Sequence, residues 1–168
     1  MKIGRKIKEH KSVKDNKGFT FVEIIVVLAI IGVLLFGVMM STSLIHSNRM
    51  RDAIGDIDSL MSSCKISTMS GEGKREDVKL VISGKPTDGY VARLYTISSS
   101  EAKVEEFLGK GFDLTSTIDG SKSIIENLTI KYKGETGAIA EPATLTEIAA
   151  GDGSKYKITI HPKTGYHE

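Results

Sequence analysis

A single carboxylate, that of Glu23, lies inside an otherwise uncharged apolar stretch near the start of this 168-residue chain. From residue 19 to residue 40 the sequence holds no other charged side chain. An ionised carboxylate is costly in lipid, so it either takes up a proton or finds a cation. The spacing therefore marks Glu23 as a candidate functional residue whose chemistry is the binding of a positive charge.

The element that positions Glu23 is predicted to be a membrane-spanning half-helix. Residues 19–40 would extend about 33 Å at roughly 1.5 Å per residue, which is enough to cross the apolar part of a bilayer. Residues 1–18 carry seven Lys or Arg and two acidic residues. Positive charge keeps its flank of the membrane segment in the cytoplasm. This predicts a cytoplasmic leader, residues 1–18, and a remainder that lies outside the cytoplasm.

Plainer interpretations compete for this segment. A cleaved secretory signal has a shorter apolar core followed by small residues, which Ser41-Thr42-Ser43 offer only loosely. A signal anchor fits the length and the charges of the segment, but it does not explain the presence of Glu23. A basic arm that binds nucleic acid explains the leader. It does not explain the hydrophobic span that follows.

The string Lys17-Gly18-Phe19-Thr20-Phe21-Val22-Glu23, followed by an Ile/Val/Leu run, resembles the class III signal of type IV prepilins and pseudopilins. The resemblance implies that a membrane aspartyl peptidase cuts after Gly18 and that the new N-terminal residue, Phe19, is N-methylated. We hypothesise that Glu23 of an incoming subunit then neutralises the Phe19 amine of a neighbour and sets the register of assembly. The resemblance covers about a quarter of the chain, and pilins and pseudopilins share it.

Two glycines, Gly32 and Gly37, interrupt the apolar stretch. Glycine is ordinary in membrane helices. It also permits close helix packing or local unwinding, so both are candidate points of helix flexibility in a filament.

Residues 41–70 are predicted to form an amphipathic half-helix, because apolar residues recur at steps of three and four. No proline interrupts residues 19–70, and Gly71 and Gly73 are expected to end the helix. Cys64, the only cysteine, cannot form an intrachain disulfide, and we interpret it as a small buried hydrophobe. The apolar face consists of Met50, Ala53, Ile54, Ile57, Leu60, Met61, Cys64 and Thr68.

Residues 74–168 are predicted to form an antiparallel β domain outside the membrane. Alternating patterns indicate strands, turn-forming residues indicate the turns between them, and Ser100 is a candidate cap for a short helix. The expected elements are strands at 78–82, 90–97, 128–133 and 156–161, turns at 86–89 and 162–165, a helix at 101–108 and a variable loop at 134–153. The fold class is therefore α+β, with a long N-terminal helix packed on a small antiparallel sheet, as in the pilin fold.

No motif for nucleophilic catalysis, phosphate binding or metal binding accompanies these elements, which predicts a structural protein without enzyme activity, cofactor or metal. Asp52, Asp56 and Asp58 lack the spacing of a calcium-binding loop, so we interpret them as a solvated helix face. His161 and His167 could meet across the final hairpin, although two surface histidines are the favoured interpretation.

A role in DNA uptake would need a basic surface. Lys131 and Lys133 share one face of a predicted strand, and Lys155 and Lys157 share one face of another. Because the chain after the leader is net acidic, we favour an ordinary solvated sheet face.

The sequence thus predicts a type IV pilin-like subunit, and an ending that resembles the closing hairpin of many minor pilins favours a minor one. The resemblance implies a prepilin peptidase and methylase, other pilin subunits, a membrane assembly platform and, indirectly, an assembly ATPase as partners. It also implies a single pass through the cytoplasmic membrane before export into a filament used in adhesion or motility. The alternatives are a pseudopilin of type II secretion or of competence DNA uptake, and a signal-anchored extracellular domain that does not assemble.

Overall fold

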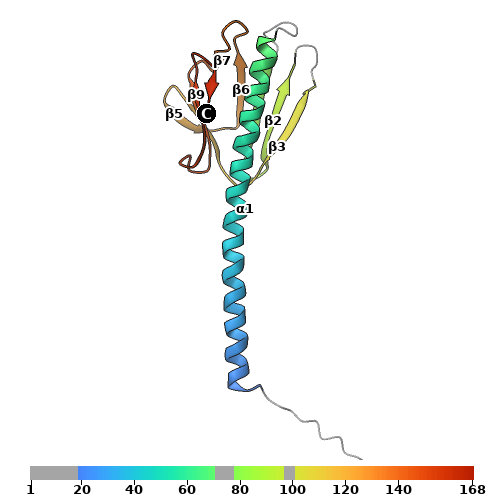
Figure 1. Ribbon diagram of the computed structural model, residues 1–168, viewed down its shortest axis with the longest axis vertical. Helices are drawn as coiled ribbons and strands as arrows, with labels where there is room; N and C mark the ends of the chain where they lie inside the picture. The colour runs from blue at the N-terminus through green and yellow to red at the C-terminus, as the bar shows by residue number, and fades with distance from the viewer. Residues whose placement is uncertain (1–18, 71–77, 97–100) are drawn as a thin grey trace, which may run out of the picture. The chain divides into compact units, whose positions relative to one another are not determined.

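The computed structural model describes residues 19–70, 78–96 and 101–168, except for the side chains of residues 37–43. The described residues form one α-helix and ten β-strands (Figure 1). The chain divides into two compact units, Met1–Met40 and Ser41–Glu168. The predicted α+β class, with an N-terminal helix packed on antiparallel strands, is confirmed.

Helix α1 comprises Phe21–Met69. In the first unit, the side chains of residues 21–36 are all exposed. In the second unit, the predicted apolar face of the helix is confirmed, because six of its eight residues are buried and Met50 and Ile54 are partly buried. The helix gives way to a turn at Ser70, and the glycines expected to end it lie outside the described residues.

The first sheet has the strand order β3-β2-β1-β6-β7, and all its neighbours are antiparallel. Its strands are β1 (Lys79–Lys85), β2 (Gly89–Tyr95), β3 (Val104–Gly109), β6 (Asn127–Tyr132) and β7 (Ile139–Glu141). The predicted hairpin at 78–97 is confirmed as β1 and β2 around a turn at 86–88, although residue 97 lies outside the described residues. The strand predicted at 128–133 is confirmed as β6.

The second sheet has the strand order β10-β9-β8-β4-β5 and is also antiparallel. Its strands are β4 (Leu114–Ile118), β5 (Ser121–Ile124), β8 (Leu145–Ala150), β9 (Tyr156–His161) and β10 (Tyr166–His167). The predicted closing hairpin is confirmed as β9 and β10. Its turn requires Gly165, which has a φ of 60° and where a Cβ would collide with the carbonyl of Gly137.

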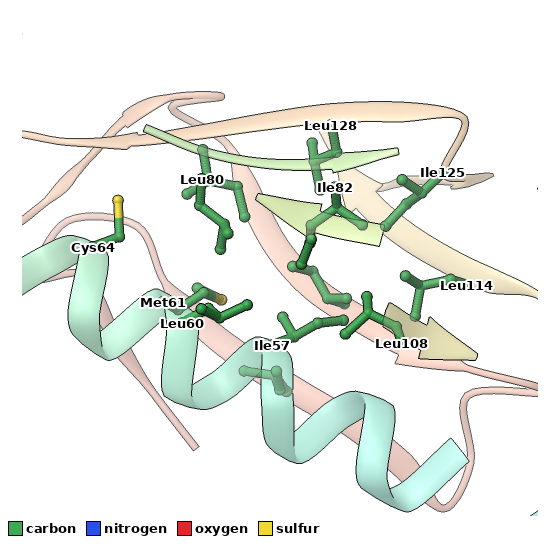
Figure 2. Close-up of a cluster of buried hydrophobic side chains, with 14 of the residues drawn as sticks. Ile57, Leu60, Met61, Cys64, Leu80, Ile82, Leu108, Leu114, Ile125 and Leu128 are labelled. Atoms are coloured by element: carbon green, nitrogen blue, oxygen red, sulfur yellow. The ribbon is translucent and has the colours of Figure 1, made fainter. Parts of the chain in front are cut away.

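One hydrophobic core joins the second half of α1 to the strands. Figure 2 shows Ile57, Met61 and Cys64 of α1 on one side of this core and Leu80 and Ile82 of β1 on the other. All five side chains are fully buried. Residues of the second sheet complete the core, including Leu114, Leu145, Ile148, Ile158 and Ile160.

The helix predicted at 101–108 is wrong, because this segment contains strand β3. Its residues pair with β2, with Leu94 opposite Val104 and Arg93 opposite Glu105. Pairing satisfies the outer backbone groups of β2, and this tertiary context outweighs the helix propensity of the Glu, Lys and Ala residues in the segment. Ser100, the expected cap, lies outside the described residues.

The variable loop predicted at 134–153 is also wrong in part, because the segment contains β7 and β8. Strand β8 lies between β9 and β4, so both of its edges are paired. Leu145 and Ile148 are fully buried, and Ala149 and Ala150 are buried beside them. Small residues that suggested a loop instead fill a tightly packed central strand.

Candidate functional site

The start of helix α1 is fixed by a reciprocal capping arrangement between Thr20 and Glu23. The Thr20 backbone N–H donates to Glu23 Oε2 at 2.8 Å, and the Thr20 hydroxyl donates to the same oxygen at 2.9 Å. In return, the Glu23 N–H donates to Thr20 Oγ1 at 3.2 Å. This is a capping box, which satisfies backbone donors that the first helical turn otherwise leaves unpaired. It places the candidate assembly carboxylate on the first turn.

Cleavage and methylation are predicted immediately before this cap. Phe19 precedes Thr20, lies outside the helix and is 83% exposed. Gly18, on the other side of the predicted cleavage site, lies outside the described residues. The described part of the site therefore consists of an exposed aromatic residue, a cap and a carboxylate in direct succession.

The helix after the cap presents an apolar surface that its own unit does not cover. Val33 is 73% exposed and Phe36 is 68% exposed, and the remaining apolar side chains from Phe21 to Leu35 are similarly open. Among the described residues, no helix is both long enough and apolar enough to cross a membrane. The predicted span at 19–40 continues beyond residue 36 into residues whose side chains are not described.

The two candidate flexibility glycines lie within helix α1. A Cβ placed on Gly32 would meet no other atom within 4 Å, so this glycine serves no close contact inside the chain. Gly37 is helical, and its surroundings lie outside the described residues.

Cys64 is the small buried hydrophobe that the sequence indicated. Its side chain is fully buried, and burial raises the pKa of the thiol to about 12. A thiol held protonated in this way is unreactive. The nearby Tyr132 hydroxyl is also buried and has no hydrogen-bond partner in the described structure, and burial raises its pKa.

The three helix carboxylates do not form a metal site. Asp56 is half-buried, and burial raises its pKa, with the charges of Glu106 and Asp52 adding to the effect. Within the described ranges, no group of three or more metal-binding side chains is assembled. Burial is the largest cause of this shift, and repulsion from the two neighbouring carboxylates adds to it.

The two C-terminal histidines do not meet. His161 stacks on the Tyr166 ring, with 5.8 Å between the ring centroids. His167 instead contacts α1, with its Nε2 at 3.5 Å from an Asp58 carboxylate oxygen and at 3.1 Å from Ser62 Oγ. The expectation of a surface histidine is wrong for His167, whose side chain is 9% exposed because the helix covers it.

The lysines considered for DNA contact are mostly engaged. Lys131 forms an ion pair with Glu141 at 2.8 Å, and Lys157 forms one with Glu147 at 3.6 Å. The Lys155 ammonium lies over the ring of the adjacent tyrosine at 5.3 Å from its centroid. Pairing with carboxylates across neighbouring strands reduces the positive potential that phosphate binding requires.

Comparison with known protein families matches residues 13–39 to the prokaryotic N-terminal methylation motif. The match includes Gly18, Phe19 and Glu23, and it confirms the predicted class III signal of type IV prepilins and pseudopilins. No curated protein and no solved structure gives a significant match to the chain. The chain therefore carries the signal of the prepilin class.

Sequence reasoning missed the role of Thr20 in this site. The spacing Thr20-x-x-Glu23 before an apolar run is itself a capping-box signature, so the signal was present. The contact between His167 and Ser62 had no comparable signal, because 105 positions separate the two residues.

Proposed function

We propose that this chain is the precursor of a structural subunit of a type IV pilus-like filament. A prepilin peptidase cleaves it after Gly18, and the new N-terminal Phe19 is methylated. The subunit has no catalytic role and acts as a substrate of the processing enzymes and then as a building block. The methylation motif at residues 13–39 is the observation that carries this proposal.

In this proposal, each successive segment of the chain has its own role. Residues 1–18 are the cytoplasmic leader, residues 19–40 the transmembrane half of the helix, residues 41–70 its amphipathic half and residues 74–168 the extracytoplasmic β domain. The subunit waits in the cytoplasmic membrane with its β domain outside, and an assembly platform then moves it into the extracellular filament. The exposed apolar surface between Phe21 and Phe36 supports this order, because lipid and then neighbouring helices would cover it.

Glu23 is the proposed assembly residue, and the capping geometry supports a specific arrangement. Both bonds from Thr20 go to Oε2, which leaves Oε1 as an acceptor for a further donor. Cleavage creates an α-amine on Phe19, and the amine of a neighbouring subunit would bind Oε1. The cap would hold the carboxylate in place while it receives that charge.

Gly32 and Gly37 are proposed to serve the assembled state. Because Gly32 makes no close contact inside the chain, close packing or local unwinding among neighbouring helices would give it a purpose.

A test of the proposed function replaces Glu23 in the native host. We expect Glu23→Val to be inserted and processed normally but to enter filaments at least ten-fold less often, because it cannot pair with the neighbouring amine. Glu23→Asp, which keeps the charge on a shorter side chain, is the matched control and should retain part of the incorporation. Quantifying the subunit in sheared filaments and in membranes checks this. Normal incorporation of Glu23→Val would contradict the proposal.

A further inference from the structure

An apolar hollow of about 540 Å³ opens at one end of the second sheet. The β4–β5 turn, the β7–β8 connection and the β9–β10 turn form it. Ala143, Thr144 and Pro162 contribute to its largely apolar lining. Asp119 and Lys163 also line it, both are exposed, and neither forms an ion pair with any described residue.

An exposed aromatic side chain lies on the first sheet, at Phe107 of the edge strand β3. It is 60% exposed. Its ring rests on Gly89, where an added Cβ would come within 2.6 Å of Cε2 of Phe107. A large aromatic residue that is seated but uncovered is typical of an anchor for a protein partner.

Two opposite charges accompany this anchor. Glu105 lies two positions before Phe107 and so shares its face of the strand. Arg93 is directly opposite Glu105 on β2 and holds its carboxylate at 2.9 Å. One cation and one anion therefore lie beside Phe107, just as one cation and one anion line the hollow.

The strands that carry the two surfaces lie on different flanks of the Ser41–Glu168 unit. In Figure 1, β3 is to the right of α1, and β5 and β9 are to its left. One chain can thus offer the aromatic anchor on one side while its hollow receives another anchor on the other side.

We propose that Phe107 of one subunit inserts into this hollow of a second copy of the chain, with Glu105 facing Lys163 and Arg93 facing Asp119. The contact joins two different surfaces, so it repeats from copy to copy without closing and suits a filament. It rests on the proposed function and adds the lateral contact between the exported domains.

Disulfide cross-linking in the native host tests this contact in the full-length chain. The parent carries Cys64→Ala, and Phe107→Cys and Thr144→Cys are added together. We expect a ladder of dimers, trimers and longer products, because each copy would cross-link on both flanks. Separate Phe107→Cys and Thr144→Cys chains, expressed together, should give dimers only. The control pair replaces Phe107→Cys by Ile124→Cys on β5, which is 52% exposed, and should give no ladder.

A charge reversal supplies a second arm that tests the assigned charge pairing. Lys163→Glu, in the cross-linking chain, should reduce the ladder at least five-fold because it would face Glu105. Lys133→Glu, another lysine in the same unit, should leave it unchanged. An equal ladder with Lys163→Glu would overturn the assigned charge pairing.

Whether the Cys64→Ala parent enters filaments distinguishes failure of this contact from failure of the proposed function. Absence of a ladder when the Cys64→Ala parent is found in filaments would overturn this contact and leave the proposed function intact. Absence of both the ladder and the parent from filaments would overturn both. The supporting result is a ladder in filaments from the Phe107→Cys and Thr144→Cys pair, with no ladder from the control pair.

Discussion

The two halves of helix α1 contain similar apolar residues but lie in opposite environments. Between Phe21 and Phe36 every side chain is exposed, as in Leu34 at 64%. Farther along the same helix, Ile57 and Met61 are fully buried in the core of the second unit. The difference lies in the charged residues: the second half alternates them with an apolar face, whereas the first half has apolar residues on all sides.

This comparison separates folding from the proposed assembly. Apolar surface that a chain covers by itself stabilises its fold, whereas surface that it leaves open must be covered by lipid or by a partner. Substitutions in the second half should therefore change the stability of the β domain. Substitutions in the first half should change processing and assembly and leave that stability unchanged.

The largest effect is expected from a substitution that blocks the proposed cleavage just before the first half of the helix. Gly18→Val adds a branched side chain at the residue that the peptidase would recognise, so we expect only the uncleaved precursor, with mature protein reduced more than ten-fold. Gly32→Ala is the matched control, because its Cβ meets nothing within 4 Å. Immunoblots of membrane fractions check both. A fully processed Gly18→Val chain would break the proposed processing site.

A pair of isoleucine substitutions tests the comparison directly. Ile57→Ala should lower the free energy of unfolding of the β domain by about 2–5 kcal/mol, because it leaves a cavity in a packed core. Ile25→Ala removes the same atoms from a residue that is 49% exposed, and it should not change that free energy measurably. Chemical denaturation of the full chain in detergent measures both. Equal losses would show that the two halves are not distinct.

The buried thiol predicts a pH dependence confined to the second half. Burial raises the pKa of Cys64 from its ordinary value of 9.0 to about 12. Above pH 9 the unfolded chain loses this proton while the folded chain keeps it, so the unfolding free energy should fall as pH rises toward 12, by at most about 1.4 kcal/mol per pH unit. Below pH 9 this contribution is constant.

Cys64→Ala supplies the reference for this pH dependence. The variant lacks the titrating group, so its stability should fall less steeply with pH than that of the natural chain. Denaturant titrations between pH 8 and pH 11 compare the two slopes. Parallel slopes would mean that the thiol is not shielded as the structure indicates.

The smallest effect is expected at the cap. Thr20→Ala removes the side-chain half of the capping box and should cost the first helical turn about 1 kcal/mol. We expect a two- to five-fold reduction in filament incorporation, because Glu23 loses its fixed position. Thr20→Ser keeps the hydroxyl and should behave like the natural chain. Subunit counts in sheared filaments measure this, and an unchanged Thr20→Ala variant would remove Thr20 from the account.

Features that depend on residues close together in the chain could be predicted from the sequence. The motif around Glu23, the buried face with Ile57 and the closing hairpin are all local patterns, and each was confirmed. Strand β3 was missed because its strand character comes from pairing with β2, and β8 because alanine is uncommon in strands.

The candidate site was partly predictable for the same reason. Glu23 could be identified because a single charge in an apolar run needs an explanation. Its partner Thr20 could have been predicted from the Thr20-x-x-Glu23 spacing. The hollow near Lys163 was not readable, because three connections distant in sequence form it.

The most direct test of the division between the two halves is the intact mass and N-terminal sequence of this subunit in filaments sheared from its native host. The account predicts a mature chain that begins at N-methylated Phe19, which would show that the exposed half enters the filament as the processed end of the subunit. A chain that begins at Met1 or near Leu44, or a subunit absent from filaments, would contradict it.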